Sequence, residues 1–397
     1  MPPAKHNPKY SSSKASIWTV CSLATLLNSG PSEETEVMRY GTQCHSLAEA
    51  LIRKALNIKN FDEDDVPIDE LKKSLDLFDE DMEQTAENYC TFVVNQYDFE
   101  KARSFNSPII YLEQFLELEV PEFKEFLSGT MDCGIYSDAD GGTLTIIDLK
   151  TGRSPVYAFN KETNKPNEQE SLYALFFYEV LLKGIYPVKK VRLEIFQPLI
   201  KNTNSYEMTI EDLLKFKEEV ILPAIARSKA EHLEGVPGPH CRWCQGRFNC
   251  VKRMEMNTQI DTKVDVTKIS DEQLELLLPK LEELKRYADD VMAYAVKRAK
   301  EGYKFKSYKL VYSKVTRKIS DEAKVAEIVK AEGIDPYGPG KLLGITELTK
   351  KLGKNRFNEL ISPFITKQES SLILVPNQDP REEVNVNQIQ EEQNNED

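Results

Sequence analysis

Two carboxylates, Asp132 and Asp148, and a lysine, Lys150, lie in two short strand-like segments of this 397-residue chain. The segments, residues 131–137 and 143–150, flank the run Asp-Ala-Asp-Gly-Gly, which is typical of a tight turn between antiparallel strands. Counting back along both segments from the turn places Asp132 opposite Asp148. Because side chains alternate along a strand, Lys150 shares their face.

Two like charges directly opposite each other, with Cβ atoms roughly 4.5 to 5.5 Å apart, destabilise a sheet unless something offsets them. A divalent cation would do so, because Mg²⁺ and Mn²⁺ commonly bind through one or two carboxylates together with a substrate phosphate. Such an ion neutralises phosphate charge and activates water, and a neighbouring lysine can stabilise the charge that develops. The other interpretation is an exposed hairpin face with two solvated acids.

The elements that must position these residues follow from hydrophobic spacing and turn signals. A helix is expected over residues 40–55, with Thr42 as its N-cap and His45 in its first turn. The acidic segment of about 57–105 is interpreted as a helical insertion. The remaining expected elements are strands over 109–120 and 190–197 and helices over 168–182 and 209–233, the last capped by Thr209. The order helix, three strands, helix, strand indicates an α/β fold with a mixed sheet rather than repeated β-α-β units.

The remainder of the chain differs in character. Residues 266–378 are expected to form a mainly helical accessory region with a basic hairpin, and the acidic tail 379–397 is expected to be disordered. Residues 297–318 hold nine bases against one acid, interleaved with Tyr and Phe. That mixture suits a nucleic-acid surface, where phosphates meet bases and rings stack on nucleobases. An ordinary solvated hairpin with an aromatic core face explains it equally well.

The net charge of −13 argues against a chain that simply coats DNA, since nonspecific DNA binding rests on Lys and Arg. No apolar run approaches the roughly 18 residues that span a bilayer, and the first residues are polar. We therefore expect a cytoplasmic protein that does not bind membranes.

Three of the seven cysteines, Cys241, Cys244 and Cys250, fall within ten positions. Thiols at this spacing are typical of metal ligands. Cys21 or His240 can supply a fourth ligand: a Cys₃His site would favour zinc, whereas a Cys₄ site could hold zinc or an iron–sulfur cluster. The other cysteines lack partner spacing and are expected in the core: Cys44, Cys90 and Cys133.

Taken together, residues 16–250 resemble the RecB-like branch of the PD-(D/E)XK nuclease superfamily. They are most similar to its iron–sulfur subset, which includes AddB-type and CRISPR-associated exonucleases. The matching motifs occur in the family's order: Gly41 with His45, Gly129 with Asp132, Asp148 with Lys150, Gln169 with Tyr173, and Cys21 with Cys241, Cys244 and Cys250. Segments around Trp18, Tyr308 and Leu374 also resemble a phage-borne family of such proteins.

The resemblance implies a restriction-endonuclease-like αβββαβ core within residues 1–255. It implies that Mg²⁺ or Mn²⁺ is held by His45, Asp132, Asp148 and the Leu149 carbonyl. Lys150 would orient the attacking water, and two further residues would position the substrate strand: Gln169 and Tyr173. The four cysteines would hold a 4Fe-4S cluster. Glu113, on the preceding strand, is either a supporting group at the metal or an ordinary surface residue.

The function implied by the resemblance is a metal-dependent DNA exonuclease acting at ends, in phage recombination or replication. Its partners would be DNA, single-stranded or at ends, and a phage single-strand-binding or recombination protein. One alternative is a non-catalytic nucleic-acid-binding or assembly protein on a nuclease scaffold with a structural zinc. A zinc-stabilised structural protein is another, and it would show no dependence on Mg²⁺ or Mn²⁺.

Overall fold

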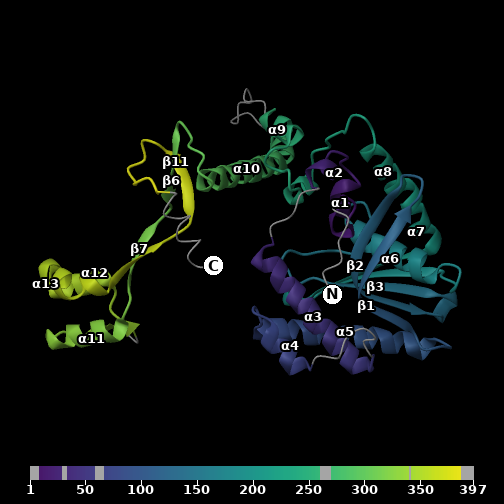
Figure 1. The fold of residues 1–397 in the computed structure, drawn as a ribbon, viewed down its shortest axis with the longest axis horizontal. Coiled ribbons are helices and arrows are strands. Elements are labelled where there is room, and N and C mark those ends of the chain that lie inside the picture. The colour runs from purple at the N-terminus through teal and green to yellow at the C-terminus, as the bar shows by residue number, and fades with distance from the viewer. Residues whose placement is uncertain (1–8, 29–33, 59–66, 260–269, 339–340, 386–397) are drawn as a thin grey trace. The chain divides into compact units, whose positions relative to one another are not determined.

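The computed structural model describes residues 9–28, 34–58, 67–259, 270–338 and 341–385. The chain divides into two compact units, residues 1–269 and residues 270–397 (Figure 1). The first unit is a mixed α/β structure built on one five-stranded sheet, and the second combines helices with three short two-stranded sheets.

The sheet of the first unit has the strand order β1-β2-β3-β4-β5. Adjacent strands are antiparallel except for β3 and β4, which are parallel and are connected through helix α6. The strands are β1 (Ile109–Val120), β2 (Glu125–Ser137), β3 (Thr143–Leu149), β4 (Lys190–Gln197) and β5 (Asn202–Thr209). β1 and β4 have the predicted bounds, and β5 was not predicted from the sequence.

One face of this sheet is covered by α6 (Glu168–Phe176), which continues as π-helical turns over Phe177–Leu182. The same apolar core includes residues of α7 (Ile210–Phe216) and α8 (Leu222–Ser228). Thr209 caps α7, as predicted, and it does so through a capping box with Asp212. The helix predicted over 209–233 therefore exists, but it ends at Ser228 and passes through a π turn.

The opposite face of the sheet is covered by α3 (Glu36–Leu56) and α5 (Glu80–Arg103), with α4 (Ile68–Ser74) beside α3. The buried Tyr89 hydroxyl of α5 donates to the Ile147 carbonyl of β3 at 3.0 Å. The described part of segment 57–105 thus includes a core helix and not only a peripheral insertion. On α5 itself, Glu80, Asp81, Glu87 and Asp98 are exposed, whereas Glu100 is buried.

The start of α3 corrects the prediction for residues 40–55. Thr35 is the N-cap and accepts from the Met38 N–H, whereas the Thr42 hydroxyl donates to the Met38 carbonyl inside the helix. His45 consequently lies in the third turn and not in the first. The earlier turn holds Val37 and Met38, but both are exposed, so this turn is not part of the buried stripe that marked the helix in the sequence.

The first unit also contains several short helices and turns, near its N-terminus and after α8. They are the 3-10 turn Ser12–Lys14, α1 (Ala15–Trp18) and α2 (Ala24–Leu27), and later the turn Pro239–Trp243 and α9 (Val251–Thr258). Ser11 forms a bridge to Ser128 of β2, and the Trp18 indole N–H donates to the Ser11 carbonyl at 3.0 Å. The N-terminal segment is therefore fixed against the sheet.

The second unit begins with the long helix α10 (Asp271–Lys300), capped by Ser270. The basic segment does not form the predicted hairpin: β6 (Tyr308–Tyr312) pairs with β11 (Leu372–Pro376), and β7 (Val315–Ile319) pairs with β10 (Ile365–Glu369). The prediction failed because the apolar partners of β6 lie about sixty residues later, beyond the reach of local turn signals.

Helices α11 (Glu322–Ala331), α12 (Ile345–Leu352) and α13 (Lys354–Leu360) contribute to a separate small core. The strands β8 (Tyr337–Gly338) and β9 (Lys341–Leu342) pair with each other. At the described start of the tail, the Val384 N–H donates to the Leu310 carbonyl at 2.8 Å. The rest of the predicted disordered tail, 386–397, lies outside the described residues.

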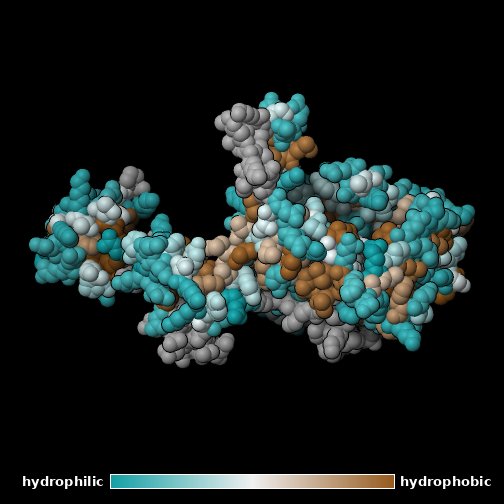
Figure 2. Space-filling view, turned by 90° about the horizontal axis from the view of Figure 1, so that it is seen from above, coloured by the Kyte–Doolittle hydropathy of each residue, from teal (hydrophilic) through white to brown (hydrophobic). Residues whose placement is uncertain are grey.

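The surfaces of both units are mainly hydrophilic, with apolar residues reaching them in separate patches (Figure 2). Among the described residues, no helix combines the length and apolar character that crossing a bilayer requires.

Candidate metal centre and cysteine pocket

The β1–β2 strand pair is irregular where the candidate site lies. Leu112 pairs with Cys133 and Gln114 pairs with Met131, but the position between them, Glu113 opposite Asp132, is left out of the regular pairing. Glu113 has φ +44°, in the left-handed region that a glutamate seldom adopts.

This irregularity reverses which face the side chains occupy. Met131 packs in the core beneath α6, whereas Cys133, two residues later, packs beneath α3 and α5. Residues two apart on a regular strand share a face of the sheet. Met131 and Cys133 do not, so the alternation of side chains between the two faces is inverted at Asp132. Non-glycine residues in this backbone region cost about 1 to 3 kcal/mol and cluster at functional sites. The inversion brings Glu113 and Asp132 toward His45 of α3.

His45, Glu113 and Asp132 form a compact set of possible metal ligands. His45 Nδ1 lies 3.1 Å from Glu113 Oε1 and 3.4 Å from Asp132 Oδ1. One ligand atom from each residue lies within 4.8 Å of the other two, and in the described ranges no other trio of His, Cys, Asp or Glu meets that distance. Carboxylates with an imidazole suit Mn²⁺, and the carboxylates also suit Mg²⁺.

The charges of these three residues shift one another's pKa values. Burial would lower the pKa of His45, but Asp132 and Glu113 outweigh it and raise that pKa well above its ordinary value. Burial would raise the pKa of Asp132, but His45, Lys150 and the Leu149 N–H lower it. Burial raises the pKa of Glu113 to about 7. A bound cation would displace the imidazolium proton, because a ligating imidazole is neutral.

Asp148 and Lys150 lie beside this set and contact each other. Lys150 Nζ is 2.8 Å from Asp148 Oδ2, and it also donates to Gln169 Oε1 at 3.3 Å. Gln169 Nε2 donates to the Tyr173 hydroxyl at 2.9 Å. Four of the residues selected from the sequence therefore form one continuous chain of contacts.

The charged groups in this chain of contacts shift one another's pKa values. Burial raises the pKa of Asp148 to about 6, although Lys150 opposes that rise. Burial would lower the pKa of Lys150, but Asp148 and then Asp132 outweigh it and raise the pKa above its ordinary value. The lysine is thus held as a cation between two carboxylates.

The predicted β2–β3 register is confirmed from Ser137 opposite Thr143 to Cys133 opposite Ile147. One position further, Asp132 Oδ2 accepts a hydrogen bond from the Leu149 N–H at 2.8 Å. The contact from Leu149 is therefore through its N–H, whereas the sequence prediction assigned its carbonyl to the metal.

The compact trio differs in composition from the predicted ligand set, which stays a prediction. Asp148 is paired with Lys150 and is not a member of the compact trio, in which Glu113 takes the third place. The sequence could not reveal this, because the left-handed backbone at Glu113 has no local signal such as Gly or Asn.

Gly129 of the Gly-x-x-Asp motif is required by close packing. A Cβ built there would lie 2.0 Å from Ser12 Oγ and 2.8 Å from Tyr173 Cε1. The motif glycine therefore lets the N-terminal segment approach the tyrosine at the end of the contact chain. Ser12 hydrogen-bonds Tyr173, and this contact was not predicted.

Glu170 is a further residue that the sequence did not single out. It is 1% exposed, and neither carboxylate oxygen has a hydrogen-bond partner among the described residues. Burial, followed by the nearby charge of Asp148, raises its pKa well above the ordinary value. Burial thus favours the neutral form of the Glu170 carboxyl group. Glutamate is usually exposed on helices, so its position next to Gln169 gave no warning of burial.

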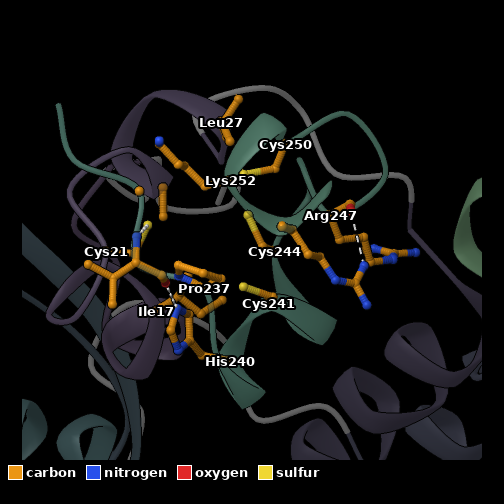
Figure 3. A pocket seen from close by; sticks show the side chains of 14 residues that line it. Ile17, Cys21, Leu27, Pro237, His240, Cys241, Cys244, Arg247, Cys250 and Lys252 are labelled. Atoms are coloured by element: carbon orange, nitrogen blue, oxygen red, sulfur yellow. Dashed lines mark hydrogen bonds between the residues drawn. The ribbon is translucent and has the colours of Figure 1, made fainter. Parts of the chain in front are cut away.

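The four cysteines predicted to be ligands line one pocket (Figure 3): Cys21, Cys241, Cys244 and Cys250. Three of the sulfurs accept hydrogen bonds. The Val236 N–H donates to Cys21 at 3.4 Å, the Gly238 N–H to Cys241 at 3.3 Å, and Asn28 Nδ2 to Cys244 at 3.5 Å. Such donors favour thiolates, the form in which cysteine binds metals.

His240 lines the same pocket, but its Nε2 lies 2.9 Å from the Val236 carbonyl. That contact requires Nε2 to donate to the carbonyl, so this nitrogen is already engaged. Ser22, beside Cys21, donates to the Glu234 carbonyl at 3.0 Å and accepts from the Glu234 N–H at 2.9 Å. The segment before Gly235 is thereby fastened to the N-terminal segment, and this geometry favours Cys21 over His240 as the fourth ligand.

The four sulfurs are not drawn into a tight group. Over the residues that the structure describes, no three cysteine sulfurs fall within 4.8 Å of one another. Cys44 and Cys133 are buried in the apolar core, as expected, and Cys90 packs against it.

Comparison with known proteins gives one family and no function. A family model described as "Protein of unknown function (DUF2800)" matches residues 8–382. A solved protein, described as "Crystal structure of SSO0001", is 14% identical and is matched over 63% of this chain and 88% of that chain, with a TM-score of 0.24. That score is too low to support an argument. The search of curated proteins gave no match.

Proposed function

The chain belongs to the DUF2800 family, and we propose that it is a metal-dependent nuclease of the RecB-like PD-(D/E)XK type that hydrolyses phosphodiester bonds in DNA. One observation carries the proposal. The contact chain from Asp148 through Lys150 and Gln169 to Tyr173 runs directly beside the trio of His45, Glu113 and Asp132. Burying charged groups is unfavourable unless they are paired, and buried charged groups with shifted pKa values cluster at functional sites. So many of them in one place therefore favour a functional site over a purely structural core.

The order of elements also supports this proposal. Helices α3, α4 and α5 are followed by strands β1, β2 and β3, helix α6 and strand β4. With α4 and α5 set aside as additions, this is the αβββαβ order of a restriction-endonuclease-like core. His45 is on α3, Asp132 on β2, and Gln169 and Tyr173 on α6.

In this proposal His45, Glu113 and Asp132 hold Mg²⁺ or Mn²⁺, with Asp148 facing the same space. The ion, when bound, supplies Lewis acidity and lowers the pKa of water. Lys150 donates to the attacking water or to a phosphate oxygen, where negative charge develops. Gln169 holds the Lys150 ammonium in place, and Tyr173 fixes Gln169. Burial favours the neutral form of Glu170, and in that form it adds no further negative charge next to the phosphate.

The proposed action on DNA ends, and a role in phage recombination or replication, rest on the sequence resemblance alone. The same holds for a phage single-strand-binding or recombination protein as partner. The contact of the site with the N-terminal segment through Ser12 does not distinguish cleavage at ends from internal cleavage.

We further propose that Cys21, Cys241, Cys244 and Cys250 hold a 4Fe-4S cluster rather than zinc. The N–H donors to three of the sulfurs support a thiolate metal site, and the choice of a cluster follows the sequence resemblance. The cluster would fasten the N-terminal segment, which carries Ser12, to the loop before α9. Its role in this proposal is to hold that segment against the catalytic residues, and no redox step is required.

The experiment is incubation of anaerobically purified, cluster-loaded protein with end-labelled single- and double-stranded DNA and Mn²⁺, beside Asp132→Asn. Glu117→Gln is the matched control, because Glu117 is an exposed acid of β1 away from the site. The proposal predicts label release by wild type and by Glu117→Gln and none by Asp132→Asn. Equal release by all three, or none by the cluster-loaded wild type, contradicts it. DNA binding without cleavage would instead favour the non-catalytic alternative.

A further inference from the structure

The loop that follows β3 is fastened to the end of β4 by a buried amide. Gln197 is the last residue of β4 and is fully buried. Its Nε2 donates to the carbonyls of Gly152 at 2.7 Å and Ser154 at 2.9 Å, and its Oε1 accepts from the Val156 N–H at 3.1 Å. A buried amide is tolerated only when its hydrogen bonds are made, so this side chain fixes the path of the loop.

Strand β5 contributes two more amides to the same loop. Asn202 Nδ2 donates to the Val156 carbonyl at 2.8 Å and to Gln197 Oε1 at 3.0 Å. Asn204 Nδ2 also donates to the Val156 carbonyl, at 3.1 Å, and its Oδ1 accepts from the Ala158 N–H at 2.7 Å. Connected hydrogen bonds of this kind make a segment rigid. The loop is therefore held in one conformation before any ligand arrives.

The start of this loop lies beside the candidate metal centre. Thr151, the residue after Lys150, lies against α3, because a Cβ built at Gly41 would be 3.3 Å from the Thr151 Oγ1. Gly41 precedes His45 by four residues, so the two share one face of that helix. The Lys150 N–H donates to the Phe196 carbonyl at 2.9 Å and continues the β3–β4 pairing. The fastened loop therefore begins at the site itself.

Two exposed cations lie at this edge of the sheet. Arg153 belongs to the fastened loop, and its Cα lies within about 11 Å of the Lys150 Cα, because only three residues separate them. Lys201 is in the turn between Gln197 and Asn202. Within the described ranges neither cation has an ion-pair partner. The parallel strands β3 and β4 both end here, and the carboxyl ends of such strands are where open α/β sheets bind ligands.

Gly152 leaves open space next to Arg153. A Cβ built there would meet no other atom of the described chain within 4 Å, and its φ lies outside the left-handed region. Neither packing nor backbone conformation therefore requires a glycine at this position. Close approach of a ligand to the backbone is a further reason for glycine. The missing side chain gives a bulky ligand access to the loop.

We propose that Arg153 and Lys201 bind phosphates of the DNA strand on either side of the one that is cleaved. The choice of DNA as ligand rests on the proposed function, whereas the position of the contacts rests on the loop. Guanidinium groups bind phosphate oxygens in pairs, and in a chain of net charge −13 unpaired cations beside the site attract a polyanion there. Because the loop is already fixed, binding costs little conformational freedom of the backbone.

The test is the salt dependence of DNA binding by cluster-loaded protein without divalent cations. It is measured by the fluorescence anisotropy of a labelled single-stranded oligodeoxynucleotide. Arg153→Gln and Lys201→Gln should each lessen the slope of log binding constant against log salt concentration by about 0.7, the change expected for one lost phosphate contact. Each should also weaken binding about tenfold at a salt concentration of about 0.05 M. Arg153→Lys keeps the charge and should keep the wild-type slope.

Lys189→Gln is the matched control. Lys189 is exposed, has no ion-pair partner in the part of the chain that the structure describes, and precedes β4 at the opposite edge of the sheet. Its slope should equal that of wild type, and all four variants should unfold thermally like wild type, because the replaced side chains are exposed. Wild-type slopes for Arg153→Gln and Lys201→Gln, an equal change for Lys189→Gln, or no binding by wild type would overturn the inference.

Failure of this inference and failure of the proposed function give different results. A wild type that releases nucleotides with Mn²⁺, while Arg153→Gln and Lys201→Gln bind DNA with the wild-type slope, contradicts the two phosphate contacts alone. A wild type that binds DNA through both contacts but releases no nucleotide contradicts the nuclease proposal and supports the contacts.

Discussion

Replacing Glu113 by Gln should weaken Mn²⁺ binding far more than replacing Asp148 by Asn. Gln keeps the shape of Glu113 and its oxygen near His45 Nδ1, 3.1 Å away in the wild type, but removes one negative charge. Two opposite unit charges 4 Å apart attract by about 4 kcal/mol at an effective dielectric constant of about 20. Desolvation and the retained amide oxygen offset part of this. A loss of about 3 kcal/mol, or about a hundredfold in affinity, remains.

Asp148→Asn removes a charge that Lys150 already neutralises at 2.8 Å, so we expect Mn²⁺ affinity to fall by less than about tenfold. Both variants should lose cleavage. Calorimetric titration with Mn²⁺, with Glu117→Gln as control, measures the difference. If Asp148→Asn weakens binding as much as Glu113→Gln, or more, the ligand set derived from the geometry is wrong and the sequence-based set is right.

Three other perturbations test separate parts of the structure. Gly129→Ala puts a Cβ 2.0 Å from Ser12 Oγ and should lower the free energy of unfolding by about 1 to 3 kcal/mol in urea denaturation; an unchanged midpoint would contradict the close packing. Burial raises the pKa of Glu194 from 4.5 to about 7, so its ionisation lowers stability as pH rises between those values. Glu194→Gln should therefore stabilise the protein by as much as about 3 kcal/mol at pH 8 and by little at pH 4, and a gain independent of pH would refute this cause. Cys244→Ala should abolish the visible absorbance of a bound cluster and make the peptide bonds near Ser12 more sensitive to protease. Bound zinc in the wild type, with a visible absorbance that Cys244→Ala leaves unchanged, would contradict the iron–sulfur assignment.

Features with strong local signals could be predicted from the sequence. The Asp-Ala-Asp-Gly-Gly turn sets the β2–β3 register, and the observed pairs from Ser137 with Thr143 onward are those counted from it. Alternating apolar residues gave the bounds of β1 and β4, and Thr209 marked a helix start. The helical spacing of Gln169 and Tyr173 places them in contact.

Features that depend on distant contacts or unusual backbone were not predicted. The sequence of β5 is polar because β5 is an edge strand that pairs only with β4 and has mostly exposed or half-buried residues. A polar segment of this kind is not distinguished from a loop by hydrophobic spacing. β6 and β7 look like a hairpin because they are adjacent, but their partners come from residues 365–376. Glu113 enters the ligand set through a left-handed backbone conformation, which glutamate identity alone does not suggest. Long-range pairing and strain therefore limited the prediction more than residue chemistry did.

The central claim is that the residues around Lys150 catalyse phosphodiester hydrolysis. Its most direct test is the rate of Mn²⁺-dependent nucleotide release from end-labelled DNA by cluster-loaded Lys150→Met, compared with wild type at saturating Mn²⁺. Removing one group that stabilises developing charge should slow the reaction by about a hundred- to a thousandfold, with Mn²⁺ affinity not decreased. Equal rates for the two proteins, in preparations that bind Mn²⁺ equally well, would contradict the claim.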